Sequence, residues 1–261
     1  MSYFEEDFEK VRRRDEERRR KRRKDEDAFE IVEEVFDRPT LMALYDLIND
    51  GIIDRMFGVV ATGKEARVYW AKNSRGDDLA VKIFLKETSD FRRSIIKYID
   101  GDPRFARMRR DIRHIIKIWC SKEFKNLKEA FAAGVRVPEP IAFRENILVM
   151  KFIGDDGVPA PLIREVPPGD PEEAFGTVLE YIKRAVLKAK IVHADLSEYN
   201  IMNWNEELYI IDWGSAVHIT HPQALEFLRR DISNIVNFFR KLGIETPSVE
   251  DIYKRLIREI P

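Results

Sequence analysis

Alternating apolar and polar positions predict four β-strands in the first half of the chain. The stretches ARVYWA (66–71) and LAVKIF (79–84) are rich in β-branched and aromatic residues and flank a Gly-containing turn at 73–78, which is the pattern of a β-hairpin. PIAFREN and ILVMKFIG (140–154) predict two further strands. Between these pairs, the basic and irregular text of residues 87–111 predicts a mobile insertion.

Apolar residues that recur every three to four positions predict several helices. The first opens at residues 37–40 and closes at 49–51. The other long ones span residues 112–131, 172–190 and 222–242, with a short helix at APLIREV (160–166) and another at the end of the chain. Short strands with a hairpin turn at 205–207 are predicted between the third and fourth long helices.

This order of elements predicts an α+β fold in which a small antiparallel-sheet lobe stands beside a larger helical lobe. We place the sheet lobe at residues 37–154 and the helical lobe at 155–261, after a charged helical extension at 1–36. Ligands commonly bind in the cleft between two such lobes.

The stretch GVVATGKEA (58–66) begins like a P-loop, with Gly58, four residues and then Gly63-Lys64. A P-loop continues with Ser or Thr, which holds Mg²⁺, and opens a helix. Here Glu65 follows instead, and then the predicted strand at 66–71, so the context excludes a P-loop. The stretch predicts a loop between strands that lies over phosphate groups, because Gly58 and Gly63 let the backbone approach a ligand closely.

Lys82 lies in the middle of a predicted strand between apolar neighbours, where its charge requires a partner. Glu123, on the helix predicted at 112–131, is the candidate partner because apolar residues flank it. A solvent-facing Lys82 and a surface Glu123 form the simpler alternative, which these two positions alone leave open.

HADLSEYN (193–200) has the Asp195 to Asn200 spacing of a protein-kinase catalytic loop, in which Asp accepts the hydroxyl proton and Asn binds Mg²⁺. Asp212 ends an apolar strand twelve residues later and precedes a Trp-Gly pair. Its carboxylate and the Asn200 amide oxygen are ligands that suit Mg²⁺. Each motif alone is weak, but the ordered set with the glycine loop, Lys82 and Glu123 predicts a kinase-like phosphotransferase.

The distribution of charge adds one feature, a basic cluster near the N-terminus. Charged residues make up 36% of the chain but the net charge is −1, so the whole chain does not indicate a polyanion partner. Residues 10–24 hold eleven basic and three acidic residues, a net charge of +8. Such a cluster predicts an arm that contacts nucleic acid, because bound Lys and Arg release counterions from phosphates. A solvated, partly helical arm is the simpler alternative.

The single cysteine, Cys120, lies within the apolar pattern of residues 112–131 and is predicted to be a core residue. The N-terminal residues have no apolar signal-peptide region, and no apolar run approaches the ~18 residues of a membrane helix. We therefore expect a cytoplasmic protein without a membrane partner.

The chain resembles the RIO family of atypical serine/threonine protein kinases, most closely its first subfamily. GVVATGKEARVYWA, AVKIF, KEFKNL, LVMKFIG, HADLSEYN, IIDWGSAV and HPQALEFLRRD carry the resemblance, over about residues 37–243. It implies a trimmed two-lobed kinase fold, ATP, and Mg²⁺ with Mn²⁺ as an alternative. It also implies serine autophosphorylation or ATPase turnover and a role in maturation of the small (30S or 40S) ribosomal subunit, whose rRNA and proteins the basic arm would contact.

The same resemblance implies roles for individual residues. Lys82 would pair with ATP phosphates and Glu123, and Asp195 would be the catalytic acid/base. Asn200 and Asp212 would hold the metal, and the Asp212 carboxylate would transiently carry a phosphoryl group. The residues near phosphate would be Gly58, Thr62, Gly63, Lys64 and Glu65, and the backbone at Lys151 and Ile153 would hold adenine.

The chain departs from the RIO family pattern at two of the compared positions and from the ordinary kinase pattern at a third. Ala61 stands where the family often has Ser, Lys151 where it has Ser or Glu, and Ala194 where ordinary kinases have Arg. Only 49 residues follow Asp212, and they contain no A-P-E motif, although ordinary kinases dock peptides on that region. An ATP-driven switch is therefore favoured over a peptide kinase, with Ser89 and Ser94 as candidate self-phosphorylation sites.

Two other functions remain open at this stage. Small-molecule kinases of the aminoglycoside or choline type share the catalytic spacing, but they need a larger helical lobe for their acceptor. A non-catalytic RNA-binding assembly factor would use nucleotide only structurally, and the complete set of Lys82, Asp195, Asn200 and Asp212 argues against it.

Overall fold

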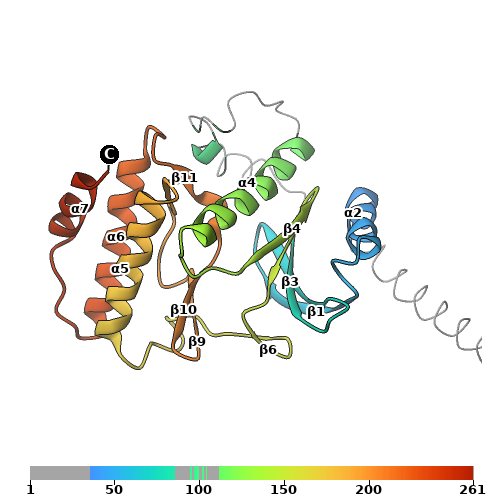
Figure 1. The fold of residues 1–261 in the computed structure, drawn as a ribbon, viewed down its shortest axis with the longest axis horizontal. Coiled ribbons are helices and arrows are strands. Elements are labelled where there is room, and N and C mark those ends of the chain that lie inside the picture. The colour runs from blue at the N-terminus through green and yellow to red at the C-terminus, as the bar shows by residue number, and fades with distance from the viewer. Residues whose placement is uncertain are drawn as a thin grey trace, which may run out of the picture. The chain divides into compact units, whose positions relative to one another are not determined.

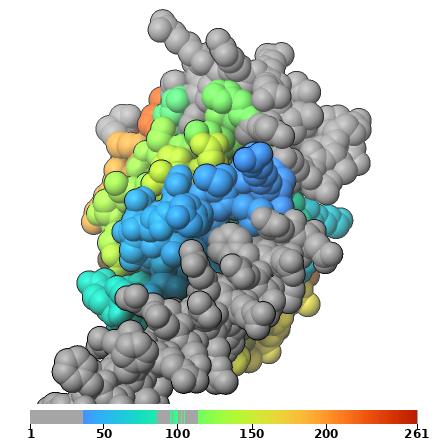
Figure 2. All heavy atoms as spheres, turned by 90° about the vertical axis from the view of Figure 1, so that its right-hand side faces the viewer, coloured from blue at the N-terminus to red at the C-terminus, as the bar shows by residue number. Residues whose placement is uncertain are grey.

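The computed structural model describes residues 36–85, 95, 97–99, 102, 104 and 112–260, which are coloured in Figures 1 and 2. The predictions for the extension at 1–36, its basic arm, Ser89, Ser94 and most of the insertion fall outside this range. The chain divides into two compact units, residues 1–46 and 47–261. Helix α2 (Arg38–Asn49) spans that boundary and confirms the first predicted helix. The Asp37 side chain accepts a hydrogen bond from the Thr40 amide at its start.

A five-stranded antiparallel sheet forms the first part of the second unit, in the order β1-β2-β3-β5-β4. The strands are β1 (Arg55–Thr62), β2 (Ala66–Lys72), β3 (Asp78–Phe84), β4 (Pro140–Arg144) and β5 (Ile147–Lys151). The four predicted strands are confirmed, and β1 adds a fifth at the edge. Lys82 pairs with Val68 on one side and Leu148 on the other, so it sits on the central strand.

Helix α4 (Ile112–Ala132) confirms the second long helix and lies between the sheet and the helices of the C-terminal half (Figure 1). It packs against β4 through Phe124 and Phe143, whose ring centroids are 5.0 Å apart. Cys120 is fully buried on it, as predicted. A single helix thus contacts both the sheet and the C-terminal half, so its side chains can join them.

The C-terminal half contains three helices and three two-stranded pairs. The helices are α5 (Pro171–Leu187), α6 (Ala224–Lys241) and α7 (Val249–Arg258); the pairs are β6 (Gly154–Asp155) with β7 (Val158–Pro159), β8 (Ile191–Val192) with β11 (Val217–His218), and β9 (Ile201–Trp204) with β10 (Glu207–Ile210). Apolar faces of α5 and α6 form the core, for example through Phe175 and Phe239. No helix among the described residues is long and apolar enough to span a membrane.

The prediction of a short helix at 160–166 is wrong. Leu162 forms an isolated β-bridge with Met202, and the amides of Glu165 and Val166 both donate to the Leu162 carbonyl, which makes a turn. A pairing partner forty residues away therefore overrides the local apolar pattern. The helix predicted at 172–190 ends earlier, at Leu187, and Lys190 already has a left-handed backbone with φ of 59°.

The β6–β7 turn, which links the sheet to the helical half, packs on Trp70 of β2. Gly157 has φ of +81°, and a Cβ built there would lie 2.5 Å from the Trp70 ring. The Trp70 indole is fixed by its hydrogen bond to Asp78 (2.7 Å) and by stacking on Phe57. The ring has little freedom to retreat, so this position admits only glycine.

We expect Gly157→Ala to destabilise the protein by about 1–3 kcal/mol more than Gly76→Ala, because overpacking adds to the strain of a left-handed backbone. Gly76 is the matched control, since its φ is +87° and a Cβ there would contact nothing within 4 Å. Urea unfolding of the two variants and the wild type measures the difference. Equal losses would show that Trp70 yields to the added methyl group.

Candidate active site

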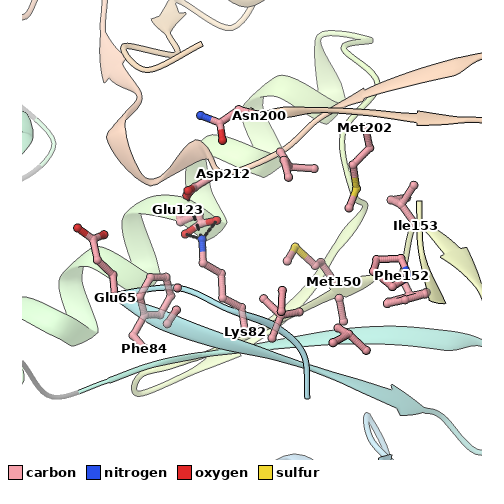
Figure 3. Close-up of a pocket in the computed structure, with 18 of the residues that line it drawn as sticks. Glu65, Lys82, Phe84, Glu123, Met150, Phe152, Ile153, Asn200, Met202 and Asp212 are labelled. Atoms are coloured by element: carbon pink, nitrogen blue, oxygen red, sulfur yellow. Dashed lines mark hydrogen bonds and ion pairs between the residues drawn. The ribbon is translucent and has the colours of Figure 1, made fainter. Parts of the chain in front are cut away.

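A cavity of about 350 Å³ opens between the β1–β2 loop and the C-terminal half (Figure 3). Eight of the residues singled out in the sequence line it: Gly63, Lys64, Glu65, Lys82, Glu123, Ile153, Asn200 and Asp212. Much of the remaining wall is apolar, with Phe84, Met150, Phe152 and Met202 among the labelled side chains. A flat apolar ligand with a charged end would match these two kinds of lining.

Lys82 is held between two carboxylates at the charged end. Its Nζ lies 2.8 and 2.9 Å from the Glu123 carboxylate oxygens and 3.0 Å from Asp212 Oδ1. Glu123 is buried on α4, whereas the Asp212 side chain is 54% exposed. The alternative of a solvent-facing Lys82 and a surface Glu123 is therefore excluded.

The electrostatics of this group follow from its burial. Burial alone would lower the pKa of Lys82, but the charges of Asp212 and Glu123 outweigh it, so the pKa lies above its ordinary value. The Lys82 charge in turn holds the pKa of Asp212 below its usual range. Lys82 is thus a permanent cation and Asp212 a permanent carboxylate near neutral pH, facing the cavity together.

Asn200 stands across from Asp212 and turns its amide oxygen toward it (Figure 3). The amide nitrogen donates to the Asp195 carbonyl (2.8 Å), which fixes that orientation. Among the described residues no group of three or more His, Cys, Asp or Glu could hold a metal. Two oxygen ligands fit Mg²⁺, which commonly takes one or two protein oxygens and completes its shell with phosphate and water.

Asp195 lies on a loop that helix α6 shapes, between the buried residues Ala194 and Leu196. The Asp231 carboxylate accepts hydrogen bonds from the amides of Ala194 (2.8 Å) and Leu196 (3.0 Å), the residues on either side of Asp195. Ala194 is thereby held at φ of 64°, a left-handed backbone that is unusual for alanine. Burial and the nearby Asp212 charge raise the pKa of Asp195, which makes it a better proton acceptor.

Sequence reasoning missed Asp231. It is almost fully buried on α6 between Leu228 and Ile232, so a charged residue within an apolar stripe was the available signal. His193 also stabilises the loop. Burial lowers the pKa of its imidazole to about 4, so the ring is neutral. Its Nε2 lies 3.1 Å from the Ile211 carbonyl. That contact ties the loop before Asp195 to the strand end before Asp212.

Four of the predicted site residues do not line this cavity. Gly58 and Thr62 belong to strand β1 and do not reach the cavity, and Asp195 does not line it either. The Lys151 side chain lines a separate groove, and its amide donates to the Glu139 carbonyl. Ile153 does line the cavity, and its carbonyl accepts from the Ala160 amide. Gly63 is held by a hydrogen bond from its amide to the Ala66 carbonyl (2.9 Å).

Solved structures share this architecture. A Rio2 kinase from Chaetomium thermophilum, described as an ADP/Mg²⁺-phosphoaspartate complex, superposes with a TM-score of 0.65 at 23% identity, over 85% of this chain and 66% of that one. A second structure of Rio2 kinase from the same organism gives a TM-score of 0.60 at 22% identity, over 81% and 66% of the two chains. The predicted trimmed, two-lobed kinase-like fold is therefore confirmed.

Sequence comparison identifies the family. The RIO domain matches residues 67–252. The RIO-type serine/threonine-protein kinase Rio1 of Haloferax volcanii is 43% identical over 239 residues, which cover 92% of this chain and 79% of that protein. The human serine/threonine-protein kinase RIO1 is 37% identical, but the match covers 85% of this chain and only 40% of the longer human protein. The chain belongs to the RIO family of serine/threonine kinases, in its RIO1-type branch.

Proposed function

We propose that this protein transfers the γ-phosphoryl group of ATP to a serine hydroxyl of its own chain or to water. We further propose that this reaction acts as a switch during maturation of the small ribosomal subunit in the cytoplasm. The observation that carries the chemical part is the Lys82 ammonium, fixed between Glu123 and Asp212 at the charged end of an otherwise apolar cavity. This arrangement matches a nucleotide with its base in the apolar part and its phosphates at Lys82.

The nucleotide would contact both ends of the cavity. The backbone at Lys151 and Ile153 would hold adenine, and Gly58, Thr62, Gly63, Lys64 and Glu65 would close over the phosphates. Residues 37–154 and 155–261 act in this proposal as the two lobes. Gly58 and Thr62 would need strand β1 to move together with the loop that follows it, since only the last three of the five line the cavity as it stands.

The polar residues of the site would divide the tasks of the transfer. Asn200 and Asp212 would hold Mg²⁺, or Mn²⁺ in its place, which would neutralise charge on the phosphate oxygens. Asp195 would accept the proton of the attacking serine hydroxyl or water. The oxygen of that hydroxyl or water would bond to the γ-phosphorus as the bond to ADP breaks. In the variant of this scheme that uses Asp212 as nucleophile, its carboxylate oxygen would bond to the γ-phosphorus as the bond to ADP breaks, and water would later hydrolyse the acyl phosphate to free phosphate and the carboxylate.

The short connection after Asp212 supports a switch rather than a peptide kinase. Eleven residues separate Asp212 from α6, which itself holds the Asp195 loop through Asp231. The connection contains η2 (Trp213–Ser215) and β11 and then enters the helix. Ordinary protein kinases use a long activation loop at this place to order their peptide site, so a peptide acceptor has little surface here.

The competing functions make different demands on the same site. A small-molecule kinase of the aminoglycoside or choline type would need an acceptor pocket beside Asp195, and the cavity described here lies at the nucleotide side instead. A non-catalytic RNA-binding factor would not need a cation held between two carboxylates.

We expect Lys82→Met to reduce ATP turnover by about 10²-fold or more, because it removes a fixed positive charge from the phosphates. Lys72→Met is the matched control, since Lys72 lies on the neighbouring strand outside the cavity and pairs with Asp78. Release of phosphate from Mg-ATP measures the effect, and melting temperatures confirm folding. Equal turnover in the two variants would contradict the assigned phosphate site.

Incubation with Mg-ATP followed by mass spectrometry should find phosphate on a serine of this chain, on Asp212, or free in solution. Transfer to generic serine or threonine peptides should be much slower than these reactions, for want of a peptide-docking surface. Asp212→Ala should abolish all products. Peptide phosphorylation as fast as ATP hydrolysis would refute the switch, and rapid transfer to aminoglycosides or choline would favour the small-molecule alternative.

Deletion of residues 1–30 should weaken binding to small-subunit rRNA and flatten its salt dependence, because the basic arm at 10–24 releases counterions on binding. Deletion of residues 1–9 is the control, since it removes four acidic residues and leaves the arm. Fluorescence anisotropy over a range of salt concentrations measures both variants. An unchanged affinity after the longer deletion would exclude the arm as an RNA contact.

A further inference from the structure

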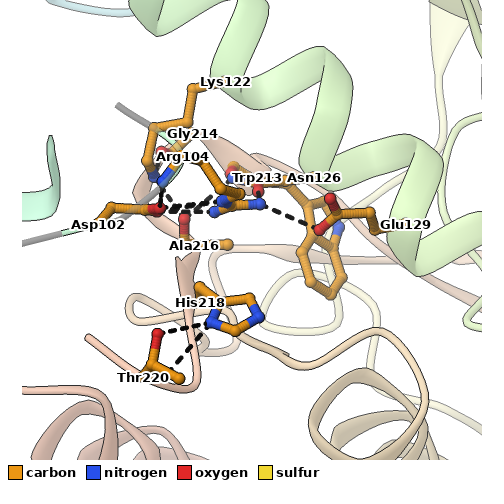
Figure 4. Close-up of polar contacts among 10 residues, drawn as sticks. All are labelled: Asp102, Arg104, Lys122, Asn126, Glu129, Trp213, Gly214, Ala216, His218 and Thr220. Atoms are coloured by element: carbon orange, nitrogen blue, oxygen red, sulfur yellow. Dashed lines mark hydrogen bonds and ion pairs between the residues drawn. The ribbon is translucent and has the colours of Figure 1, made fainter. Parts of the chain in front are cut away.

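One face of α4 is directed at the segment that follows Asp212. Trp119, Lys122, Glu123 and Asn126 follow the i, i+3, i+4, i+7 spacing of a helix face, and each is at most 4% exposed. The function proposed above uses only Glu123. The other three contact residues 213–216, which directly continue from Asp212. Figure 4 shows Lys122 and Asn126 at this segment.

Lys122 is the least expected member of this face because a fully buried lysine is rare. Its Nζ donates to the Gly214 carbonyl (2.8 Å) and to the Ala216 carbonyl. Burial lowers its pKa to about 7, and the charge of Arg104 acts in the same direction while Asp102 opposes it. Even a neutral amine keeps two N–H donors, one for each of these carbonyls.

Asn126 contributes two more donors to the same segment. Its Nδ2 donates to the carbonyls of Trp213 (2.8 Å) and Ala216 (3.0 Å). Its Oδ1 accepts from Arg104 (2.9 Å), which also pairs with Asp102 and Glu129. Arg104 thereby fixes which end of the amide faces the carbonyls (Figure 4).

The segment requires such support because its backbone is strained. Asp212 has φ of 62° and ψ of 65°, a left-handed conformation that a residue with a side chain keeps only when its surroundings impose it. Gly214 is also tightly enclosed, since a Cβ there would lie 3.1 Å from the Trp119 ring. The carbonyls of residues 213, 214 and 216 then point at Lys122 and Asn126.

We propose that Lys122 and Asn126 are positioning residues that hold the Asp212 carboxylate where it can bind Mg²⁺. The inference rests on the proposed function, because it concerns the metal-binding role of Asp212. Without these donors the carbonyls of Gly214 and Ala216 lose their side-chain partners, and the Trp213 carbonyl keeps only the Ala216 amide. The backbone at Asp212 then relaxes, and its carboxylate moves away from Asn200. Groups that orient a metal ligand typically change metal affinity or activity by about 10–100-fold when removed.

Two variants remove the donors while preserving shape. Lys122→Met keeps an unbranched apolar side chain of similar length without a donor. Asn126→Asp keeps the oxygen that accepts from Arg104 but presents a second acceptor to the carbonyls. Leu127→Ala is the control for lost packing, since Leu127 is buried on the same helix and does not contact residues 213–216 through a hydrogen bond.

The readout is the Mg²⁺-dependent part of the thermal stabilisation that ADP gives, measured over a range of Mg²⁺ concentrations at saturating ADP. The Mg²⁺ midpoint is the Mg²⁺ concentration that gives half of this stabilisation. We expect it to rise by about tenfold or more in Lys122→Met and in Asn126→Asp. The stabilisation that ADP gives in the absence of Mg²⁺ should be unchanged. The Mg²⁺ requirement of ATP turnover should shift in parallel. Leu127→Ala should melt at a lower temperature with the wild-type midpoint.

A wild-type midpoint in both donor variants, together with a melting temperature lowered as in Leu127→Ala, would overturn the inference and leave the two residues as ordinary core. If Lys122→Met does not fold, Asn126→Asp alone decides between these outcomes. Asp212→Ala should remove the Mg²⁺-dependent part entirely. A wild-type protein that shows no such part would overturn the proposed metal site itself, which separates failure of the function from failure of this inference.

Discussion

The fixed position of one largely enclosed cation organises this molecule. The Lys82 ammonium joins strand β3 to Glu123 of α4 and to Asp212 of the C-terminal half. Glu123 is nearly inaccessible to water, and an unpaired carboxylate in that place would be strongly destabilising. The sheet, the helix and the loop that follows β10 must therefore meet at one point, and the cavity is the space left around it.

The two loops that complete the site are held by helices in the same way. Ala194, which precedes Asp195, and Asp212 itself both have left-handed backbones. Buried polar side chains satisfy the main chain beside each one: Asp231 of α6 at the first loop, and Lys122 and Asn126 of α4 at the second. Strain at a functional site persists when its surroundings over-determine it, and here two helix faces provide that constraint.

The sequence was sufficient for residues whose partners are other side chains. Lys82 and Glu123 could be paired because each is a charge among apolar neighbours, and the strands and long helices followed from their periodicity. It was insufficient where the partner is main chain. Lys122, Asn126 and Asp231 bind carbonyls and amides that exist at every position, so the sequence does not identify their partners. Asp231 alone stands out, as a charge within an apolar stripe, but that pattern does not show which amides it binds. The helix expected at 160–166 failed because Leu162 pairs with Met202, a long-range contact that outweighs local propensity.

The shared helix limits how the site can be switched. In many kinases the helix that bears the glutamate moves away from the lysine to disable the enzyme. Here such a movement of α4 would separate Glu123 from Lys82 and at the same moment withdraw Lys122 and Asn126 from residues 213–216. Several buried polar groups would lose their partners together, which is far more unfavourable than breaking one ion pair. The arrangement therefore disfavours a displaced helix and leaves occupancy by nucleotide as the variable that a switch could use.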